Sequence, residues 1–277
     1  MLQVDNNLNM SGILSKMQVN LNQENLVEYY LVLDNTPRVL LNNFLGKNVC
    51  LEFSSLIKCI YCNKRTKSSY SQGYCYICAK TLARCDLCIV RPKNCHYHLG
   101  SCREPKWGQE HCFTSHIVYL ANSSGIKVGI SRATNIPNRW IDQGAIQALP
   151  IISTASRYQA GLIEDILAKG VADKTNWRKM LNFNIDLIDL IAIKDDLLHK
   201  FNKELADIKF DLVNTNNVIN INYPISFIEH KISLNTLNKL HIIEGTLLAI
   251  KGQYLIFEHG VINIRNFSGY EINFRAS

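Results

Sequence analysis

Ten cysteines, all within residues 50–112, are the side chains of this 277-residue chain best suited to chemistry. Cys59 and Cys62 form one C-x-x-C pair, and Cys75 and Cys78 form another after twelve intervening residues. Each pair can point two thiolates at one ion, and two such pairs complete the tetrahedral sulfur site that Zn²⁺ prefers. Four thiolates leave no position for a catalytic water, so we expect this zinc to be structural.

A second series of potential metal ligands follows the first. It consists of a C-x-x-C pair and two more evenly spaced cysteines: Cys85, Cys88, Cys95 and Cys102. We expect these four to hold a second structural Zn²⁺, with His96 or His98 as the alternatives for the last two ligands. Cys50 and Cys112 are left over, and a free cysteine is most often a small buried hydrophobic residue.

The composition is that of an ordinary folded, soluble protein. Hydrophobic residues make up 47% of the chain and charged residues 19%, values that exclude a mainly disordered chain. No run approaches the ~18 uncharged apolar residues that a membrane span needs, and the first residues lack the pattern of a secretory signal. We therefore expect a cytoplasmic protein without a membrane partner, whose clustered cysteines bind metal and do not form disulfides.

The net charge of +7 is concentrated in the middle of the chain. Residues 59–112 carry nine Lys and Arg against three Asp and Glu, and residues 113–180 carry eight against four. The two ends, residues 1–58 and 181–277, are slightly acidic. Basic side chains neutralise phosphates and release counterions, so we expect a nucleic acid, DNA or RNA, as partner. The alternative is a solvated basic surface.

The segment after the cysteines alternates short strands and helices. Two runs rich in β-branched and aromatic residues, 116–121 and 126–131, flank an Asn-Ser-Ser-Gly turn signal and predict a β-hairpin. A short helix and a third strand over 148–154 follow, and Pro150 suggests that this strand lies at a sheet edge. A second helix is expected to begin at a capping box that opens with Ser156.

This segment resembles the core of the GIY-YIG nucleases. The likeness rests on Ile117-Val118-Tyr119 and Lys127-Val128-Gly129 in the two strands, Arg139 on the first helix and Glu164 on the second. It implies a three-stranded antiparallel sheet with helices and a metal-dependent endonuclease site. In that site Tyr119 would deprotonate or orient a water, Arg139 would bind the scissile phosphate, and Glu164 would hold Mg²⁺. Lys127 replaces a second tyrosine of the family, and we expect it to contact a phosphate.

Nearly the whole chain is also similar to a bacterial family described only as domain of unknown function 2797. Four stretches carry this similarity: Ser71-Gln-Gly-Tyr-Cys75, Cys102-Arg-Glu-Pro-Lys-Trp-Gly108, Arg139-Trp-Ile-Asp-Gln-Gly144 and Asp173-Lys-Thr-Asn-Trp177. The family is uncharacterised, so the similarity implies no activity.

The patterns together predict an α+β protein with four segments. These are a β-rich N-terminal segment (1–56), a Cys-rich zinc-binding domain (57–114), a GIY-YIG-like domain (115–180), and a helix followed by a small antiparallel β domain (181–277). The last segment has an amphipathic helical pattern before its strands, and its acidic balance suits a protein partner better than a nucleic acid.

Three functions fit this sequence. The first is a zinc-binding protein whose GIY-YIG-like module binds nucleic acid and cleaves phosphodiesters with Mg²⁺, using Tyr119, Lys127, Arg139 and Glu164. The second is a non-catalytic nucleic-acid-binding module with structural zinc. The third is an adaptor that binds another protein through its zinc segment and C-terminal strands.

Overall fold

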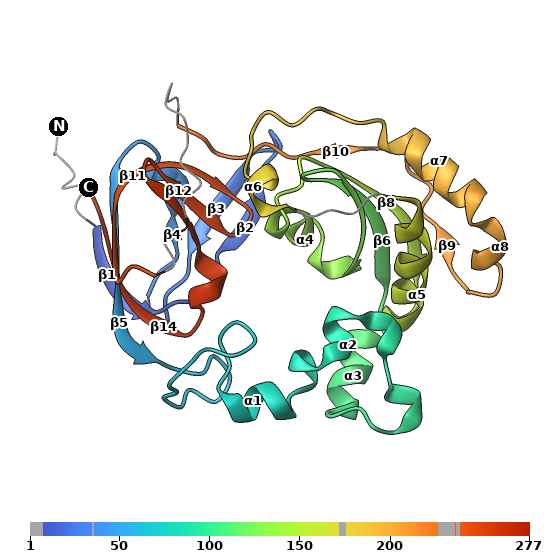
Figure 1. The fold of residues 1–277 in the computed structure, drawn as a ribbon, viewed down its shortest axis with the longest axis horizontal. Coiled ribbons are helices and arrows are strands. Elements are labelled where there is room, and N and C mark those ends of the chain that lie inside the picture. Colours follow the sequence, from blue (N-terminus) through green and yellow to red (C-terminus); the bar gives the residue numbers. More distant parts are fainter. Residues whose placement is uncertain (1–7, 35, 172–175, 227–235, 237–238) are drawn as a thin grey trace. The chain divides into compact units, whose positions relative to one another are not determined.

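The computed structural model describes residues 8–34, 36–171, 176–226, 236 and 239–277. It confirms the predicted mixed α+β class, with several antiparallel sheets and helices (Figure 1). Part of one family-like stretch, Asp173-Lys174-Thr175, lies outside the described residues. Within the described ranges, no helix is long and apolar enough to cross a membrane.

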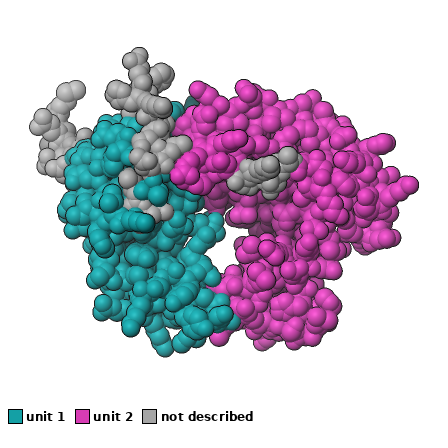
Figure 2. All heavy atoms as spheres, in the orientation of Figure 1, with its two compact units in different colours: residues 1–80, 222–277 teal, residues 81–221 magenta. Residues whose placement is uncertain are grey.

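The chain forms two compact units, and Figure 2 shows which residues belong to each. Unit 1 joins Met1–Lys80 to Asn222–Ser277, and unit 2 is the continuous stretch Thr81–Ile221. This division differs from the four expected segments. The expected zinc-binding domain, residues 57–114, is divided after Lys80, so the two cysteine series belong to different units.

Unit 1 is organised by a six-stranded sheet built from both ends of the chain, in the order β1-β14-β5-β11-β12-β13. The strands are β1 (Leu8–Ile13), β5 (Asn48–Ile57), β11 (Ile242–Lys251), β12 (Tyr254–Phe257), β13 (Gly260–Asn263) and β14 (Tyr270–Ala276). In β14, Phe274 pairs with Met10 on one side and with Leu51 on the other. These pairings join the expected N-terminal and C-terminal segments into one body, because strands distant in sequence share one hydrogen-bonded sheet.

Smaller elements complete unit 1. A three-stranded sheet has the order β2-β3-β4, with β2 (Gln18–Leu21), β3 (Val27–Leu31) and β4 (Val39–Leu40). Two short 3₁₀ helices are η1 (Leu41–Phe44) and η7 (Ile264–Phe267). Helix α1 (Tyr76–Thr81) carries Cys78, the last residue of the first cysteine series, and ends at the boundary with unit 2.

Unit 2 contains the hairpin and the third strand that the sequence predicts. The hairpin is β6 (His116–Asn122) with β7 (Ile126–Arg132), and the third strand is β8 (Gln147–Thr154). The sheet order is β10-β8-β6-β7, and β9 (Asp211–Leu212) also pairs with β8 beside β10 (Ile219–Asn220).

The prediction that β8 lies at a sheet edge is wrong. β8 has β6 on one side and β9 and β10 on the other. Pro150 is tolerated because it lies between the residues that pair with β10, Gln147 and Ala148, and those that pair with β9, Ile152 and Ser153. A proline cannot donate a ladder hydrogen bond, and this gap in the pairing requires none.

The helices of unit 2 include α5, which begins after Ser156 as predicted; the Ser156 Oγ accepts a hydrogen bond from the Gln159 N–H at 3.3 Å. The unit contains α2 (Leu87–Val90), α3 (Pro105–Cys112), α4 (Asn138–Asp142), α5 (Arg157–Leu167), α6 (Trp177–Met180), α7 (Leu190–Lys200) and α8 (Asn202–Leu205), with 3₁₀ turns η2 (Ala83–Cys85), η3 (Pro92–Asn94), η4 (Tyr97–Leu99), η5 (Ala133–Asn135) and η6 (Ala168–Gly170).

The core of unit 2 lies between the sheet and three of these helices. Buried side chains of β6, β7 and β8 pack against those of α5, α7 and α8, among them Val118, Leu120, Ile152, Ile163, Leu167, Leu197 and Phe201. Each fully buried aliphatic side chain of this kind contributes about 1.5–3 kcal/mol. This packing fixes the hairpin and α5, and with them the polar residues that they carry.

Tyr119 departs from this core because side chains alternate along β6. It is fully buried, and its ring makes an edge-to-face contact with Trp140 of α4 at a centroid distance of 5.9 Å. Tyr119 pairs with Gly129 across the hairpin. A Cβ at Gly129 would lie 2.7 Å from both Cζ and the hydroxyl oxygen of Tyr119, so only glycine leaves room for the ring.

We therefore expect Gly129→Ala to lower the free energy of unfolding by about 1–3 kcal/mol, through overpacking against the Tyr119 ring. Urea denaturation measures this loss. Gly129→Ala in a Tyr119→Leu background is the matched comparison, and there the cost should shrink because the ring is gone. Equal costs in the two backgrounds would show that the ring does not set the requirement for glycine.

Candidate functional site

Four cysteines of unit 1 come together as their spacing predicts. The sulfur atoms of Cys59, Cys62, Cys75 and Cys78 all lie within 4.8 Å of one another, and those of Cys62 and Cys75 are 3.8 Å apart. Zinc–sulfur bonds of about 2.3 Å place tetrahedral thiolates about 3.8 Å apart. The group can therefore hold a zinc ion, and it is compatible with a zinc ribbon.

Backbone turns aim these four thiols. After β5, Asn63 adopts a left-handed φ of 55° and donates its N–H to the Cys59 carbonyl at 2.9 Å, which closes the first knuckle. Gly73, with a φ of 123°, precedes the second pair. Cys78 lies on α1, and its N–H points to the Cys75 sulfur at 3.5 Å. Asn and Gly are the residues that adopt such left-handed conformations at least cost.

The thiols of this group influence one another strongly. Burial opposes ionisation of Cys59, but backbone hydrogen bonds, chiefly from Cys62 and Cys75, outweigh it and lower its pKa to about 6. Burial raises the pKa of Cys78, and the neighbouring thiols raise it further. Four thiolates this close together repel one another, and a bound divalent cation would offset that repulsion.

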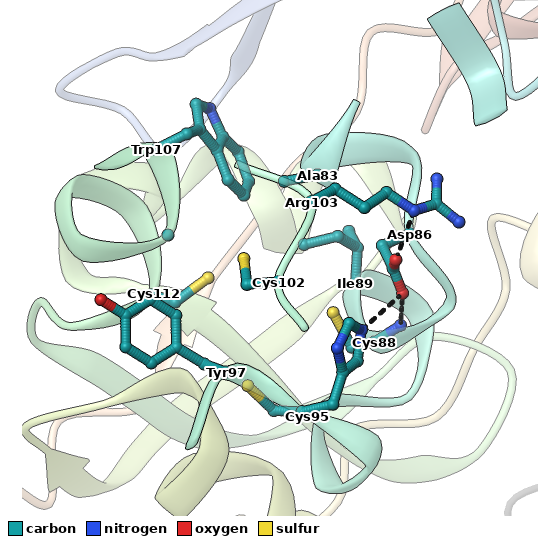
Figure 3. Close-up of a pocket in the computed structure, with 12 residues that line it drawn as sticks. Ala83, Asp86, Cys88, Ile89, Cys95, Tyr97, Cys102, Arg103, Trp107 and Cys112 are labelled. Atoms are coloured by element: carbon teal, nitrogen blue, oxygen red, sulfur yellow. Dashed lines mark hydrogen bonds and ion pairs between the residues drawn. The ribbon is translucent and has the colours of Figure 1, made fainter. Parts of the chain in front are cut away.

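The second cysteine series belongs to unit 2, and three of its four members surround a small cavity (Figure 3). Cys88, Cys95 and Cys102, all expected as ligands, line this cavity. Cys85 is not among the described residues that line it, and Cys112, which the sequence leaves without a role, is. Ligand atoms of Asp86, Cys88 and His96 also lie within 4.8 Å of one another.

The other expected alternative ligand, His98, has a different neighbour. Its ring lies 6.3 Å from that of Tyr158, measured between centroids. His96 does line the cavity, and its Nδ1 is 2.9 Å from the Ser101 hydroxyl.

The structure brings Tyr119 and Arg139 together in unit 2. The Tyr119 hydroxyl donates to the Gln143 side-chain oxygen at 3.0 Å. Burial raises the pKa of Tyr119 to about 12, while the charge and hydrogen bond of Arg139 oppose this rise, and the charge of Glu164 adds to it. The Tyr119 pKa therefore responds to both the guanidinium and the carboxyl group. We name Tyr119, Arg139 and Glu164 the trio.

Three cationic side chains act on the carboxyl group of Glu164 of α5. Burial raises the pKa of its carboxyl group, and the charges of Arg139, Arg157 and Lys127 act against that rise. Lys127, which stands in place of the second tyrosine, therefore lies close enough to influence the trio. The net effect of the site is to disfavour a bare carboxylate, a condition that a bound cation would relieve.

Glu164 also lines a pocket of about 360 Å³ that the cysteine segment helps to form. Arg91 and Lys93, from the chain between Cys88 and Cys95, line the same pocket. This segment packs closely on α5, because a Cβ at Gly161 would overlap Pro92 of η3. Sequence reasoning missed this juxtaposition; its only signal was the positive charge of residues 59–112.

Arg157 is a second residue that sequence reasoning missed. It follows the cap of α5, and its Nη2 donates to the Ile89 carbonyl at 2.6 Å. Burial lowers its pKa, and the charges of Cys112, Arg139 and Glu164 all act on it. Its buried Nε has no hydrogen-bond partner among the described residues. The sequence marks this position only as the start of a helix.

Comparison with known proteins finds a family match for the sequence. A family model described as "Protein of unknown function (DUF2797)" matches residues 46–272. That span includes both cysteine series and the trio. No curated protein and no solved structure matches the chain. The chemistry of the sites therefore rests on the residues and distances given above.

We expect Cys75→Ser to remove one equivalent of zinc and to lower the melting temperature. The reason is that the binding free energy of a structural zinc, about 10 kcal/mol or more in small zinc domains, is also folding free energy. Elemental analysis and thermal unfolding measure the two effects. Cys50→Ser, in β5 and outside both series, is the control and should keep all of the zinc. A wild-type protein free of zinc would contradict the prediction.

Proposed function

Since the chain belongs to the family described as "Protein of unknown function (DUF2797)", we propose its function from its own residues: unit 2 binds nucleic acid at the trio and cleaves phosphodiester bonds there with Mg²⁺. The proposal is supported by the charges of Arg139 and Glu164, which both act on the pKa of the Tyr119 hydroxyl, and by the pocket that Glu164 lines together with Arg91. A phosphate, a hydroxyl and a hard cation each find a suitable partner in this set. The GIY-YIG likeness of the segment assigns the same residues.

Arg139 is the phosphate-binding residue of this proposal. A guanidinium presents two parallel N–H donors to a phosphate and stays charged at all relevant pH values. Lys127 adds a point charge nearby, and Arg91 lines the pocket beside Glu164, where the Lys93 ammonium is paired with the Asp165 carboxylate at 2.7 Å. Arg139, Lys127 and Arg91 together supply the positive field that holds a polyanion.

Glu164 is the residue that would hold Mg²⁺. Glu164 offers the ion one carboxylate at a pocket of about 360 Å³, and Mg²⁺ accepts a single carboxylate and completes its shell with water. When bound, the ion would polarise a phosphoryl oxygen and lower the pKa of a water. Glu164 would supply the carboxylate that holds the ion, and Arg139 would bind the phosphate.

In this proposal Tyr119 orients the attacking water and does not act as the general base. With its pKa raised to about 12, its hydroxyl stays protonated near neutral pH. A general base works best with a pKa near the operating pH, which Tyr119 does not have. Its hydrogen bond to Gln143 and its contact with Trp140 hold the ring and hydroxyl in one position.

The second candidate function is nucleic-acid binding without cleavage. Two features favour it: the buried, protonated Tyr119, and Lys127 in place of the second tyrosine of the nuclease motif. Both leave the phosphate-binding cations in place and weaken the case for turnover. Cleavage assays separate the two candidates.

The first cysteine segment of unit 1 offers independent support for a nucleic-acid partner. Tyr70 and Tyr76 stand edge to face at a centroid distance of 5.6 Å, and the Lys80 ammonium lies 5.8 Å from the Tyr76 ring. Tyr61 and Tyr76 are more than half exposed, at 52% and 56%. Exposed aromatic rings beside cations are typical of surfaces on which single-stranded bases stack. A protein partner for the C-terminal strands stays a prediction.

We expect Arg139→Ala to weaken nucleic-acid binding by about tenfold to a hundredfold, the loss of one charged hydrogen-bonding group. The slope of log affinity against log salt concentration should become shallower by about one, the equivalent of one lost phosphate contact. Fluorescence anisotropy with labelled DNA and RNA at several salt concentrations measures both. Lys179→Ala, an exposed cation of α6, is the matched control and should bind like wild type. Affinity that does not change with salt would contradict the proposal.

We expect Glu164→Gln to reduce Mg²⁺-dependent cleavage by about a hundredfold or more while the protein still binds nucleic acid, because the charge that holds the cation is lost. Gel assays on DNA and RNA, with and without Mg²⁺, measure cleavage. Asp196→Asn, which removes an exposed carboxylate of α7, is the control and should keep the activity. If the wild-type protein binds but cuts neither substrate, the second candidate function stands and the first fails.

A further inference from the structure

We propose that Cys88, Cys95, Cys102 and Cys112 of unit 2 form a second structural zinc site, in which Cys112 takes the position that sequence spacing assigns to Cys85. The inference concerns metal content and does not depend on nuclease activity. Its basis is the arrangement of these four side chains around one small cavity (Figure 3).

The four sulfur atoms come from four different places in the segment and border the same space. Cys88 lies on α2, Cys95 follows η3, Cys102 lies in the loop before α3, and Cys112 is the last residue of α3. Figure 3 shows their side chains around the interior of the cavity. Its volume of about 20 Å³ suits a single ion or water and no organic ligand.

The geometry of α3 explains why Cys112 takes part. Gly108 precedes Cys112 by four residues, so the two lie on the same face of the helix. Gly108 allows α3 to approach the loop: a Cβ there would lie 3.4 Å from the Cys102 sulfur and 3.3 Å from the Tyr97 ring. The face of α3 that carries Cys112 therefore packs against the Cys102 loop, and the spacing of the earlier cysteines gives no sign of this.

Asp86 and His96, whose ligand atoms also lie near Cys88, have other roles. Asp86 accepts from the Cys88 N–H at 3.1 Å and pairs with the Arg103 Nε at 2.6 Å. His96 uses Nε2 toward Asp86, at 3.5 Å, and Nδ1 toward Ser101, at 2.9 Å. Both ring nitrogens thus have partners. The Asp86 carboxylate positions the Cys88 knuckle, as carboxylates beside metal ligands commonly do.

The segment needs a metal because it lacks a core of its own. Several of its large apolar side chains point to water: Leu87 is 59% exposed, Val90 77% and Leu99 70%. The ligand atoms of this second site are wider apart than those of the first, since the 4.8 Å group here contains only Cys88 of the four cysteines. A bound zinc would draw the four sulfurs together and join α2, the η3 loop and α3.

Elemental analysis of the full chain tests the proposal. Wild type should hold two zinc ions, Cys112→Ser should hold one, and Cys85→Ser should hold two. The zinc kept at Cys59, Cys62, Cys75 and Cys78 shows that the Cys112 variant still folds in unit 1. One zinc in wild type, or one in Cys85→Ser with two in Cys112→Ser, would overturn the proposal.

Thiol alkylation gives a second readout that needs no variant. Wild-type protein is treated with N-ethylmaleimide before and after zinc chelation, and each cysteine is followed by mass spectrometry. Cys112 should react at least tenfold faster once zinc is removed, together with Cys88, Cys95 and Cys102, whereas Cys85 should change little. A Cys112 rate that chelation leaves unchanged would show that its sulfur holds no metal.

Discussion

Ionised thiols held a few ångströms apart repel one another, and that repulsion favours the binding of a cation by the cysteine segment of unit 1. Cys59 and Cys78 are buried, so water does little to screen the charge of the group. The same segment exposes much of its apolar material, including Ile60 and Ile77 at 45% and 70%. A bound zinc would therefore supply the stability that a hydrophobic core supplies elsewhere.

Unit 2 depends on a different constraint, the close approach of a ring to a backbone. The Tyr119 ring occupies the space that any side chain at position 129 would need. That contact places the hydroxyl next to Gln143 and within reach of Arg139. The core between the sheet and α5 holds in place the helix that carries Glu164. Two features thus position the polar groups of the trio. Apolar packing holds α5, which carries Glu164, and the absence of a side chain at Gly129 leaves room for the Tyr119 ring.

The sequence predicts what is local and misses what is not. The hairpin, the start of α5 and the Cys59–Cys78 group follow from short spacings, because each depends on neighbours within about twenty residues. The six-stranded sheet of unit 1 does not, because β14 pairs with β1 and β5 through contacts that no local pattern encodes. Pro150 in an internal strand, Arg157 near Glu164 and Cys112 at the second cavity are missed for the same reason: their roles are set by tertiary neighbours.

The position of β14 between β1 and β5 has a consequence for biosynthesis. A ribosome releases β1 and β5 early, then all of unit 2, and only afterwards the strand that fills the space between the first two. Unit 2 can fold while it is being made, whereas the edges of β1 and β5 that pair with β14 stay unpaired until β14 is made. Unpaired edges attract other strands. The nascent chain therefore exposes the edges of β1 (Leu8–Ile13) and β5 (Asn48–Ile57) to aggregation until β14 is translated.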